Sequence, residues 1–167
     1  MAGIPHVQTM KKSTALTLKK SEMEPVIADL KQLLADYQIY YANLRGFHWH
    51  IRGPQFFTLH AQLEKLYIDA ANKADMLAER LLMLGDTPDC KFSDYLAMSH
   101  IKEVDGVSDG RKAAEHILDS LHHLIDHQRG VAEKADEAHD IGTADMLTLF
   151  IEDQEKYVWM FSAYMDK

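Results

Sequence analysis

The segment GDTPDCKFSDYLAMSHIKEVDGV, residues 85–107, separates two long stretches in which apolar residues recur at helical spacing. Antiparallel helices that are neighbours in a bundle are usually joined by about 2–8 residues. A link of 23 residues is long enough to run down the length of a bundle, so it predicts a crossover rather than a tight turn. Within the link, residues 93–98 favour a short helix of their own.

The sequence predicts an all-α four-helix bundle, with this crossover between its second and third helices. The four long helical stretches cover about residues 21–50, 55–84, 108–140 and 143–167. Ser21 and Glu24 have the spacing of a capping box at the start of the first stretch, and Pro25 falls in its first turn. Gly85 is a typical helix end, and Thr143 is a suitable N-cap for the last stretch.

The composition is that of one globular domain. The chain has 167 residues, 47% of them hydrophobic and 26% charged, and its formal net charge is −8. An acidic chain repels phosphate, which excludes a generally basic nucleic-acid binder. No apolar run approaches the ~20 residues that span a bilayer, and no signal-peptide core forms. A single cysteine, Cys90, cannot form a disulfide within the chain, which fits a reducing compartment. Together with the lack of a long apolar run, this leads us to expect a cytoplasmic protein without membrane contact.

The charge is unevenly distributed along the chain. Residues 1–21 contain four lysines and no acidic residue, whereas the rest contains 14 basic and 26 acidic side chains. The first segment also lacks apolar periodicity. We therefore predict a mobile basic tail at residues 1–21 and a bundle domain at residues 22–167.

Histidines and carboxylates at helical spacing form the main candidate site. His60 and Glu64 lie four residues apart, as do Asp75 and Glu79, so each pair shares one helix face. Fifteen residues separate His60 from Asp75, which corresponds to about 22 Å along a straight helix. The two pairs therefore cannot bind one metal within one helix. They can do so if a second copy of the helix packs antiparallel across a two-fold axis, which produces the site twice.

His48, at the end of the first helical stretch, can join His60 in such a site. Two imidazoles with two or three carboxylates and no thiolate suit Fe(II), Mn(II) or Zn(II). A di-iron site inside one bundle requires a Glu-x-x-His motif on each of two helices. None of the ten glutamates has a histidine three residues later, which disfavours that alternative. Carboxylates four residues apart are also common on solvated helix surfaces, so the spacing alone leaves a purely structural interpretation open.

Longer motifs around these residues are more specific. The segment NLRGFHWHIRGPQFFTLH at residues 43–60, followed by DMLAER at 75–80, resembles the Dps family, the DNA-binding proteins from starved cells, which are twelve-subunit mini-ferritins. The resemblance also includes FSDYL at 92–96 and YVWM at 157–160, and it extends from about residue 22 to the end. It implies a ferritin-like four-helix bundle.

The resemblance implies a di-iron ferroxidase site at a dimer interface. His48 and His60 come from one subunit, and Asp75 and Glu79 come from its two-fold mate, with Glu79 at or near a bridging position. Glu64 stands where the family often has a further acidic group. The implied reaction oxidises Fe(II) with hydrogen peroxide, with oxygen slower, and stores Fe(III) mineral in a hollow dodecamer that protects DNA from oxidative damage. Zn(II) or Mn(II) can substitute for iron at such a site.

The resemblance also implies roles outside the iron ligands. Trp49 lies beside the site, where it can take up an oxidising equivalent. Asp140 and Asp145, with Asp136 as a further candidate, match acidic residues that line pores at the family's three-fold axes. An alternative function is that of a nucleoid protein that binds DNA through its basic tail. The lysines available for that contact are Lys11, Lys12, Lys19 and Lys20.

The sequence leaves the roles of several histidines undecided, and it allows one further function. His50 is either an extra ligand or a surface residue, and we favour the surface because it points away from the direction of His48. His123 and His127 have the spacing to chelate a metal, but the sequence identifies no partner carboxylate for them or for His122. An inactive shell that serves only for adhesion or packing is disfavoured by the intact ligand set.

Overall fold

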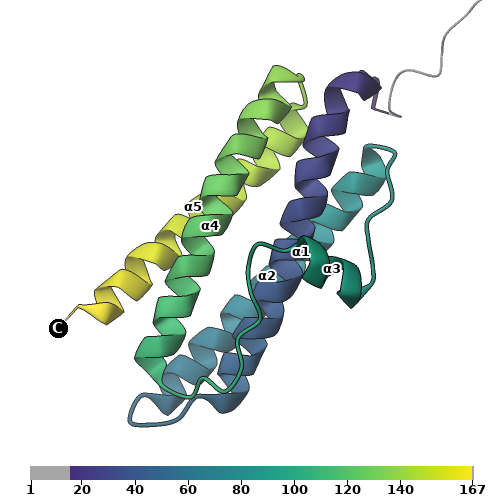
Figure 1. Cartoon of the computed structure of the whole chain (residues 1–167). Helices are drawn as coiled ribbons and strands as arrows, with labels where there is room; N and C mark the ends of the chain where they lie inside the picture. The colour runs from purple at the N-terminus through teal and green to yellow at the C-terminus, as the bar shows by residue number, and fades with distance from the viewer. Residues whose placement is uncertain (1–15, 167) are drawn as a thin grey trace, which may run out of the picture.

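The computed structural model describes residues 16–166, and within this range it contains five helices (Figure 1). Four helices are long, and the fifth is a short helix in the crossover. Their bounds are α1 Lys20–His50, α2 Phe56–Met83, α3 Phe92–Met98, α4 Gly110–Glu137 and α5 Ile141–Met165. The predicted all-α fold with its extra helix is confirmed. Across residues 16–166, each helix is too short or too polar to cross a membrane.

The connection between α2 and α4 is the crossover that the sequence predicts. The crossover leaves α2 at one end of the bundle and enters α4 at the opposite end (Figure 1). As a result α2 and α4 run in the same direction. On the way the crossover forms the short helix α3, which packs against α1. Helix α1 packs mainly against α2, α4 packs mainly against α5, and α1 also contacts α4 and α3. The bundle therefore consists of two antiparallel hairpins joined by a crossover, which is ferritin-like connectivity.

Helix α1 is enclosed on more than one face. Residues 33–37 are all buried, although they include the charged Asp36. A helix that packs against one partner buries only a stripe. The burial of five consecutive residues follows because α2, α4 and the crossover each cover part of α1. This enclosure places a carboxylate inside the protein.

The start of α1 differs from the prediction. Helix α1 begins at Lys20, and its N-cap residue Lys19 makes no side-chain capping bond. The predicted capping box of Ser21 and Glu24 is wrong because both residues already lie inside the helix. Lys19 instead forms an exposed ion pair with Glu22, with Nζ and Oε1 2.8 Å apart. Lys20 and Ser21 therefore belong to α1, while most of the predicted tail at residues 1–21 lies outside the described residues.

The turn between α4 and α5 also differs from the prediction. Helix α4 ends at Glu137 because His139 adopts a left-handed backbone with a φ of 59°. The amides of His139 and Asp140 then bond back to carbonyls in the last turn of α4, which is a Schellman arrangement. Asp140, and not the predicted Thr143, is the N-cap of α5, and it accepts a 3.2 Å bond from the Thr143 amide.

The two ends of the crossover, at the end of α2 and the start of α4, follow simple capping rules. Gly85 ends α2 as predicted, with a φ of 84° that suits glycine. The amides of Gly85 and Asp86 close the last turn of α2. Helix α4 begins slightly later than predicted, because Asp109 is its N-cap and accepts a 2.9 Å bond from the Lys112 amide.

Candidate metal centre

His48 and His60 lie together at the closed end of the α1–α2 hairpin. The turn through Gly53 and Pro54 brings the last turn of α1 against the first turns of α2. The two imidazole rings stack with their centroids 3.8 Å apart. His48 Nδ1 lies 2.9 Å from the His60 carbonyl oxygen, and His60 Nδ1 lies 2.9 Å from the His48 carbonyl oxygen. The two histidines therefore hold each other in a reciprocal pair.

This reciprocal pair fixes the tautomer of both rings. A carbonyl oxygen can only accept a hydrogen bond, so Nδ1 of each ring carries the hydrogen. In the neutral imidazole, Nε2 then keeps its lone pair. Metal-binding histidines usually donate their other N–H to a carbonyl or a carboxylate in the same way. The Nε2 atoms of His48 and His60 are therefore prepared to bind a metal.

Aromatic rings support the histidine pair on both sides. Phe56 stacks on His60 with ring centroids 5.0 Å apart, and Tyr67 meets the ring of His48 edge-on at 5.3 Å. The Tyr67 hydroxyl donates to Glu64 Oε1 at 3.3 Å. Burial, followed by the nearby charge of Glu64, raises the pKa of Tyr67, so it stays a donor. Glu64 therefore stands close to the ring that packs on His48.

Two residues that follow His48 are exposed. Trp49 is 64% exposed, and the guanidinium of Arg45 lies 4.9 Å from its ring centroid. His50 is exposed at the last position of α1. The indole thus adjoins the histidine pair along α1 without being enclosed by the chain.

Asp75 and Glu79 lie on the same helix as His60 but far from it. Both carboxylates are exposed on α2, and the helix between them and His60 is continuous, which keeps the two groups about 22 Å apart. Asp75 also lines a hollow of about 360 Å³ together with Tyr41 and the exposed Cys90. One chain therefore holds the imidazoles and the carboxylates at separate places.

The centre of the bundle offers no alternative iron site among the described residues. Tyr37, Gln128 and Gln154 are fully enclosed there. The Tyr37 hydroxyl donates to Gln128 Oε1 at 3.3 Å and accepts from Gln154 Nε2 at 2.7 Å, while Gln128 Nε2 donates to Gln154 Oε1 at 2.7 Å. The three side chains are neutral and bonded to one another, whereas a di-iron site needs ionised carboxylates.

The acidic residues near the start of α5 differ in their surroundings. Asp140 is buried, forms an ion pair with Arg80 of α2, and caps α5. Asp145 and Asp136 are exposed. The carboxylate of Asp140 is therefore engaged in structural bonds, and only the other two are free to face a pore.

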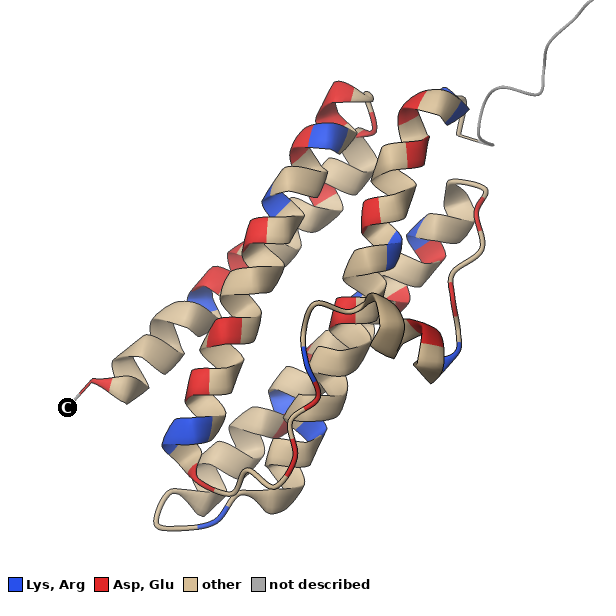
Figure 2. Cartoon of the chain, viewed as in Figure 1, with Lys and Arg blue, Asp and Glu red and all other residues tan. Residues whose placement is uncertain are grey.

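The predicted DNA contacts lie partly beyond the described chain. Lys11 and Lys12 fall outside residues 16–166, while Lys19 and Lys20 stand at the start of α1. Figure 2 shows acidic residues along all the long helices, with basic residues scattered among them. Each long helix therefore carries both acidic and basic residues.

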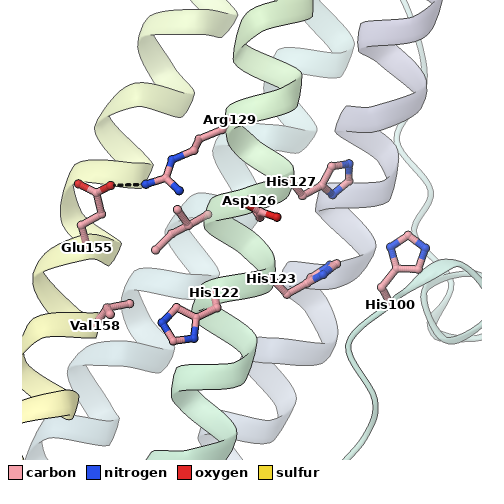
Figure 3. Close-up of a pocket in the computed structure, with 9 residues that line it drawn as sticks. His100, His122, His123, Asp126, His127, Arg129, Glu155 and Val158 are labelled. Carbon is pink, nitrogen blue, oxygen red and sulfur yellow. Dashed lines mark hydrogen bonds and ion pairs between the residues drawn. The ribbon is translucent and has the colours of Figure 1, made fainter.

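A second cluster of histidines has the carboxylate partner that the sequence did not identify. Asp36 Oδ2 lies 3.1 Å from His123 Nε2 and 3.6 Å from His127 Nδ1. Burial alone raises the pKa of the Asp36 carboxyl. The imidazoles of His127 and His123, together with hydrogen bonds from His100 and Ser99 of the crossover, outweigh that effect and lower the pKa to about 2. His122 is not part of the cluster, because it is exposed on another side of α4 (Figure 3).

Comparison with known proteins assigns the family. The ferritin-like domain family matches residues 27–167. The "DNA protection during starvation protein" of Porphyromonas gingivalis is 46% identical over 159 residues, which cover 95% of this chain and 100% of that protein. The chain belongs to the Dps family. The resemblance carried by the motifs at residues 43–60 and 75–80 is thus confirmed.

Solved Dps structures share the whole fold. The Dps protein of Vibrio cholerae O1, described as a member of a broad superfamily of ferritin-like diiron-carboxylate proteins, is 38% identical to this chain. It matches with a TM-score of 0.92 over 95% of this chain and 99% of its own. The Dps protein of Bacillus brevis is 34% identical, with a TM-score of 0.85 over 89% of this chain and 100% of its own. The Dps fold of this chain includes the crossover and α3.

Proposed function

We propose that this Dps chain is a ferroxidase and an iron store. It oxidises Fe(II) with hydrogen peroxide, and more slowly with oxygen, at di-iron sites between two-fold related subunits. A hollow dodecamer in the bacterial cytoplasm keeps the Fe(III) as mineral and so protects DNA from oxidative damage. The observation that carries this proposal is the reciprocal pairing of His48 and His60, in which each Nδ1 is bonded to a carbonyl oxygen and Nε2 is the nitrogen left for a metal.

The exposed face of α2 supports the two-fold pairing. If His60 of one copy meets Asp75 and Glu79 of another in an antiparallel contact, Ile68 lies at the midpoint, next to the two-fold axis. Ile68 is 48% exposed in the single chain. Other large apolar side chains of α2 are also exposed, namely Phe57, Met76, Leu82 and Met83. Apolar surface of this extent on one chain is typical of an interface.

Apolar side chains are also exposed on elements outside α2, which favours an assembly larger than a dimer. On α3 they include Phe92 and Leu96, and on α5 they include Leu149 and Trp159. A closed shell needs more than one kind of contact per subunit, because a single two-fold contact produces only a dimer. The dodecamer of the family satisfies this requirement.

The proposed reaction balances at a paired site. Two Fe(II) ions each lose one electron, and these two electrons cleave the O–O bond of one peroxide. With two protons the peroxide leaves as two waters, so no hydroxyl radical is released by a one-electron step. His48 and His60 hold the iron through Nε2, while Asp75 and Glu79 of the second copy supply the negative charge that stabilises Fe(III).

Further residues adjust this site and its supply of iron. Glu79 stands at or near a bridging position, and Glu64 assists the more weakly held iron. Trp49 takes up an oxidising equivalent when iron is incompletely loaded. Zn(II) and Mn(II) compete for the same ligands, because mixed imidazole and carboxylate sites accept all three ions. Asp145 is our candidate for the pore that admits Fe(II).

Rapid mixing of anaerobic protein and Fe(II) with peroxide or with air tests the ferroxidase proposal. Fe(III) absorbance should rise faster with peroxide. A His60→Ala/Asp75→Ala double variant should lower the initial rate by at least about tenfold, because both halves of the site lose ligands. The oxidised iron should elute with a large assembly. Equal rates for the wild type and an assembled double variant would show that the interface site is not catalytic.

DNA binding is a second proposed function, favoured by the four lysines of the first 20 residues and by the name of the Porphyromonas gingivalis relative. Many tails on one assembly would make the contact multivalent and sensitive to salt. We expect the full-length protein to retard DNA in a gel at low salt and not at high salt. A Lys11→Ala/Lys12→Ala variant should weaken the shift. No retardation by full-length protein at low salt would contradict this function.

A further inference from the structure

A cluster of one carboxylate and three imidazoles lies where α1, α4 and the crossover meet. Asp36 comes from α1, His100 from the crossover, and His123 and His127 from α4. Figure 3 shows His123 and His127 pointing from α4 toward the side on which His100 lies. The four residues come from three segments distant in sequence, so the fold itself brings them together. All of them belong to one chain, unlike the two halves of the ferroxidase site.

The distances in this cluster suit a metal ion. The ligand atoms offered by Asp36, His100 and His123 all lie within 4.8 Å of one another. In a tetrahedral zinc site with bonds of about 2.0–2.1 Å, neighbouring ligand atoms lie about 3.3 Å apart. The distances from Asp36 Oδ2 to His123 Nε2 and to His127 Nδ1, 3.1 and 3.6 Å, bracket that value. A small rotation of His100, which is exposed, brings the third imidazole into range.

The two oxygens of Asp36 have different partners. Oδ1 accepts from the Ser99 hydroxyl at 3.0 Å and from the His100 amide at 2.7 Å. These bonds attach the crossover to α1 and account for the burial of a carboxylate at this place. Oδ2 faces the imidazoles, and it is hydrogen-bonded to His123 Nε2 at 3.1 Å. The bonds of Oδ1 alone attach the crossover to α1, so a cation can replace the hydrogen between Oδ2 and His123 without breaking that attachment.

His127 gives an independent indication of a ligand. Its Nδ1 atom is buried and has no hydrogen-bond partner, because the 3.6 Å separation from Asp36 is too long for such a bond. A buried polar atom without a partner is costly. A cation between Asp36 and His127 would satisfy this atom. The cluster adjoins a hollow of about 790 Å³ that His100, His123 and His127 line, so an ion has a route to it.

We propose that Asp36, His100, His123 and His127 bind a divalent transition-metal ion of the zinc class, at a site separate from the ferroxidase centre. Three imidazoles and one carboxylate without a thiolate suit Zn(II) and similar ions. The bound ion links the crossover to α1 and α4. Since all four ligands belong to one chain, the site forms without a second copy.

Zinc counting in matched variants tests this proposal. The background is the full chain with His60→Ala and Asp75→Ala, so that the ferroxidase ligands do not contribute and the outcome is independent of that function. Zn(II) bound per chain is measured by equilibrium dialysis. We expect His123→Ala and His100→Ala each to lose one Zn(II) per chain. The control His122→Ala should lose none, because this adjacent histidine is exposed and outside the cluster (Figure 3).

The comparison with His122→Ala makes the result decisive. If His123→Ala or His100→Ala binds as much Zn(II) as the control, the assigned ligand set is wrong. Equal losses in all three variants would also overturn it, because the loss would not depend on the cluster. Helical content and assembly size confirm that each variant folds. Should one fail, Asp36→Asn keeps the shape of the side chain, removes its charge, and should also lose the ion.

Discussion

Chains with His60→Ala and chains with Asp75→Ala should each be nearly inactive alone and should recover about a quarter of wild-type activity when they assemble together. In the proposed arrangement, each ferroxidase site takes its imidazoles from one chain and its carboxylates from the other. A mixed dimer therefore has one intact site and one doubly altered site. Random pairing makes about half of the dimers mixed, so about a quarter of all sites is intact. The initial rate of peroxide-dependent Fe(II) oxidation measures this recovery.

The matched control combines His60→Ala chains with His48→Ala chains. Both substitutions remove an imidazole from the same half of the site, so every site in every dimer keeps one damaged half. We expect no recovery above the separate variants, each of which should be at least about tenfold slower than wild type. Recovery in this control, or none with Asp75→Ala, would contradict a site shared in this way.

Arg80→Ala should lower the free energy of unfolding by about 3–5 kcal/mol. Arg80 pairs with Asp140, which is 2% exposed, and its Nε donates to the Thr143 hydroxyl at 2.8 Å. Removal of the guanidinium leaves a buried charge without its partner at the start of α5. For a chain of this length, such a loss corresponds to a fall of at least about 6 °C in the thermal midpoint.

Arg129→Ala is the matched control for Arg80→Ala. Arg129 and Glu155 are also in contact, with Nη2 and Oε1 2.6 Å apart, but both side chains are about half exposed. An exposed pair contributes at most about 1 kcal/mol. A double variant, Arg80→Ala with Asp140→Asn, keeps a residue that can cap α5 and removes the unpaired charge, so it should regain part of the stability. Equal losses for the two arginine variants would refute the explanation from burial.

The sequence was sufficient for the helices and their connectivity, because both depend on local patterns. The helical period gave the long helices, and the length of the link at residues 85–107 gave the crossover. Helix ends were less predictable. Ser21 and Thr143 are good N-caps in isolation, but the chain turns elsewhere, and Lys19 and Asp140 take those places. Capping depends on where neighbouring segments allow the helix to begin.

The contacts of Asp36 could not be predicted from the sequence. It stands among buried neighbours in LLADY, residues 33–37, and a charged residue in such a run was the one available signal. Its partners His123 and His127 lie about 90 residues away on α4. Whether these side chains meet depends on the path of the crossover over α1. Helical periodicity carries no information about that path.

The separation of imidazoles and carboxylates along α2 affects what a newly synthesised chain can do before it assembles. A newly synthesised chain carries only half of each proposed ferroxidase centre, so it is inert toward iron and peroxide until it has dimerised. Ferric iron is then made only where a growing assembly is present to retain it. Oligomerisation in this way acts as a safeguard during biogenesis, and no separate inhibitor is required.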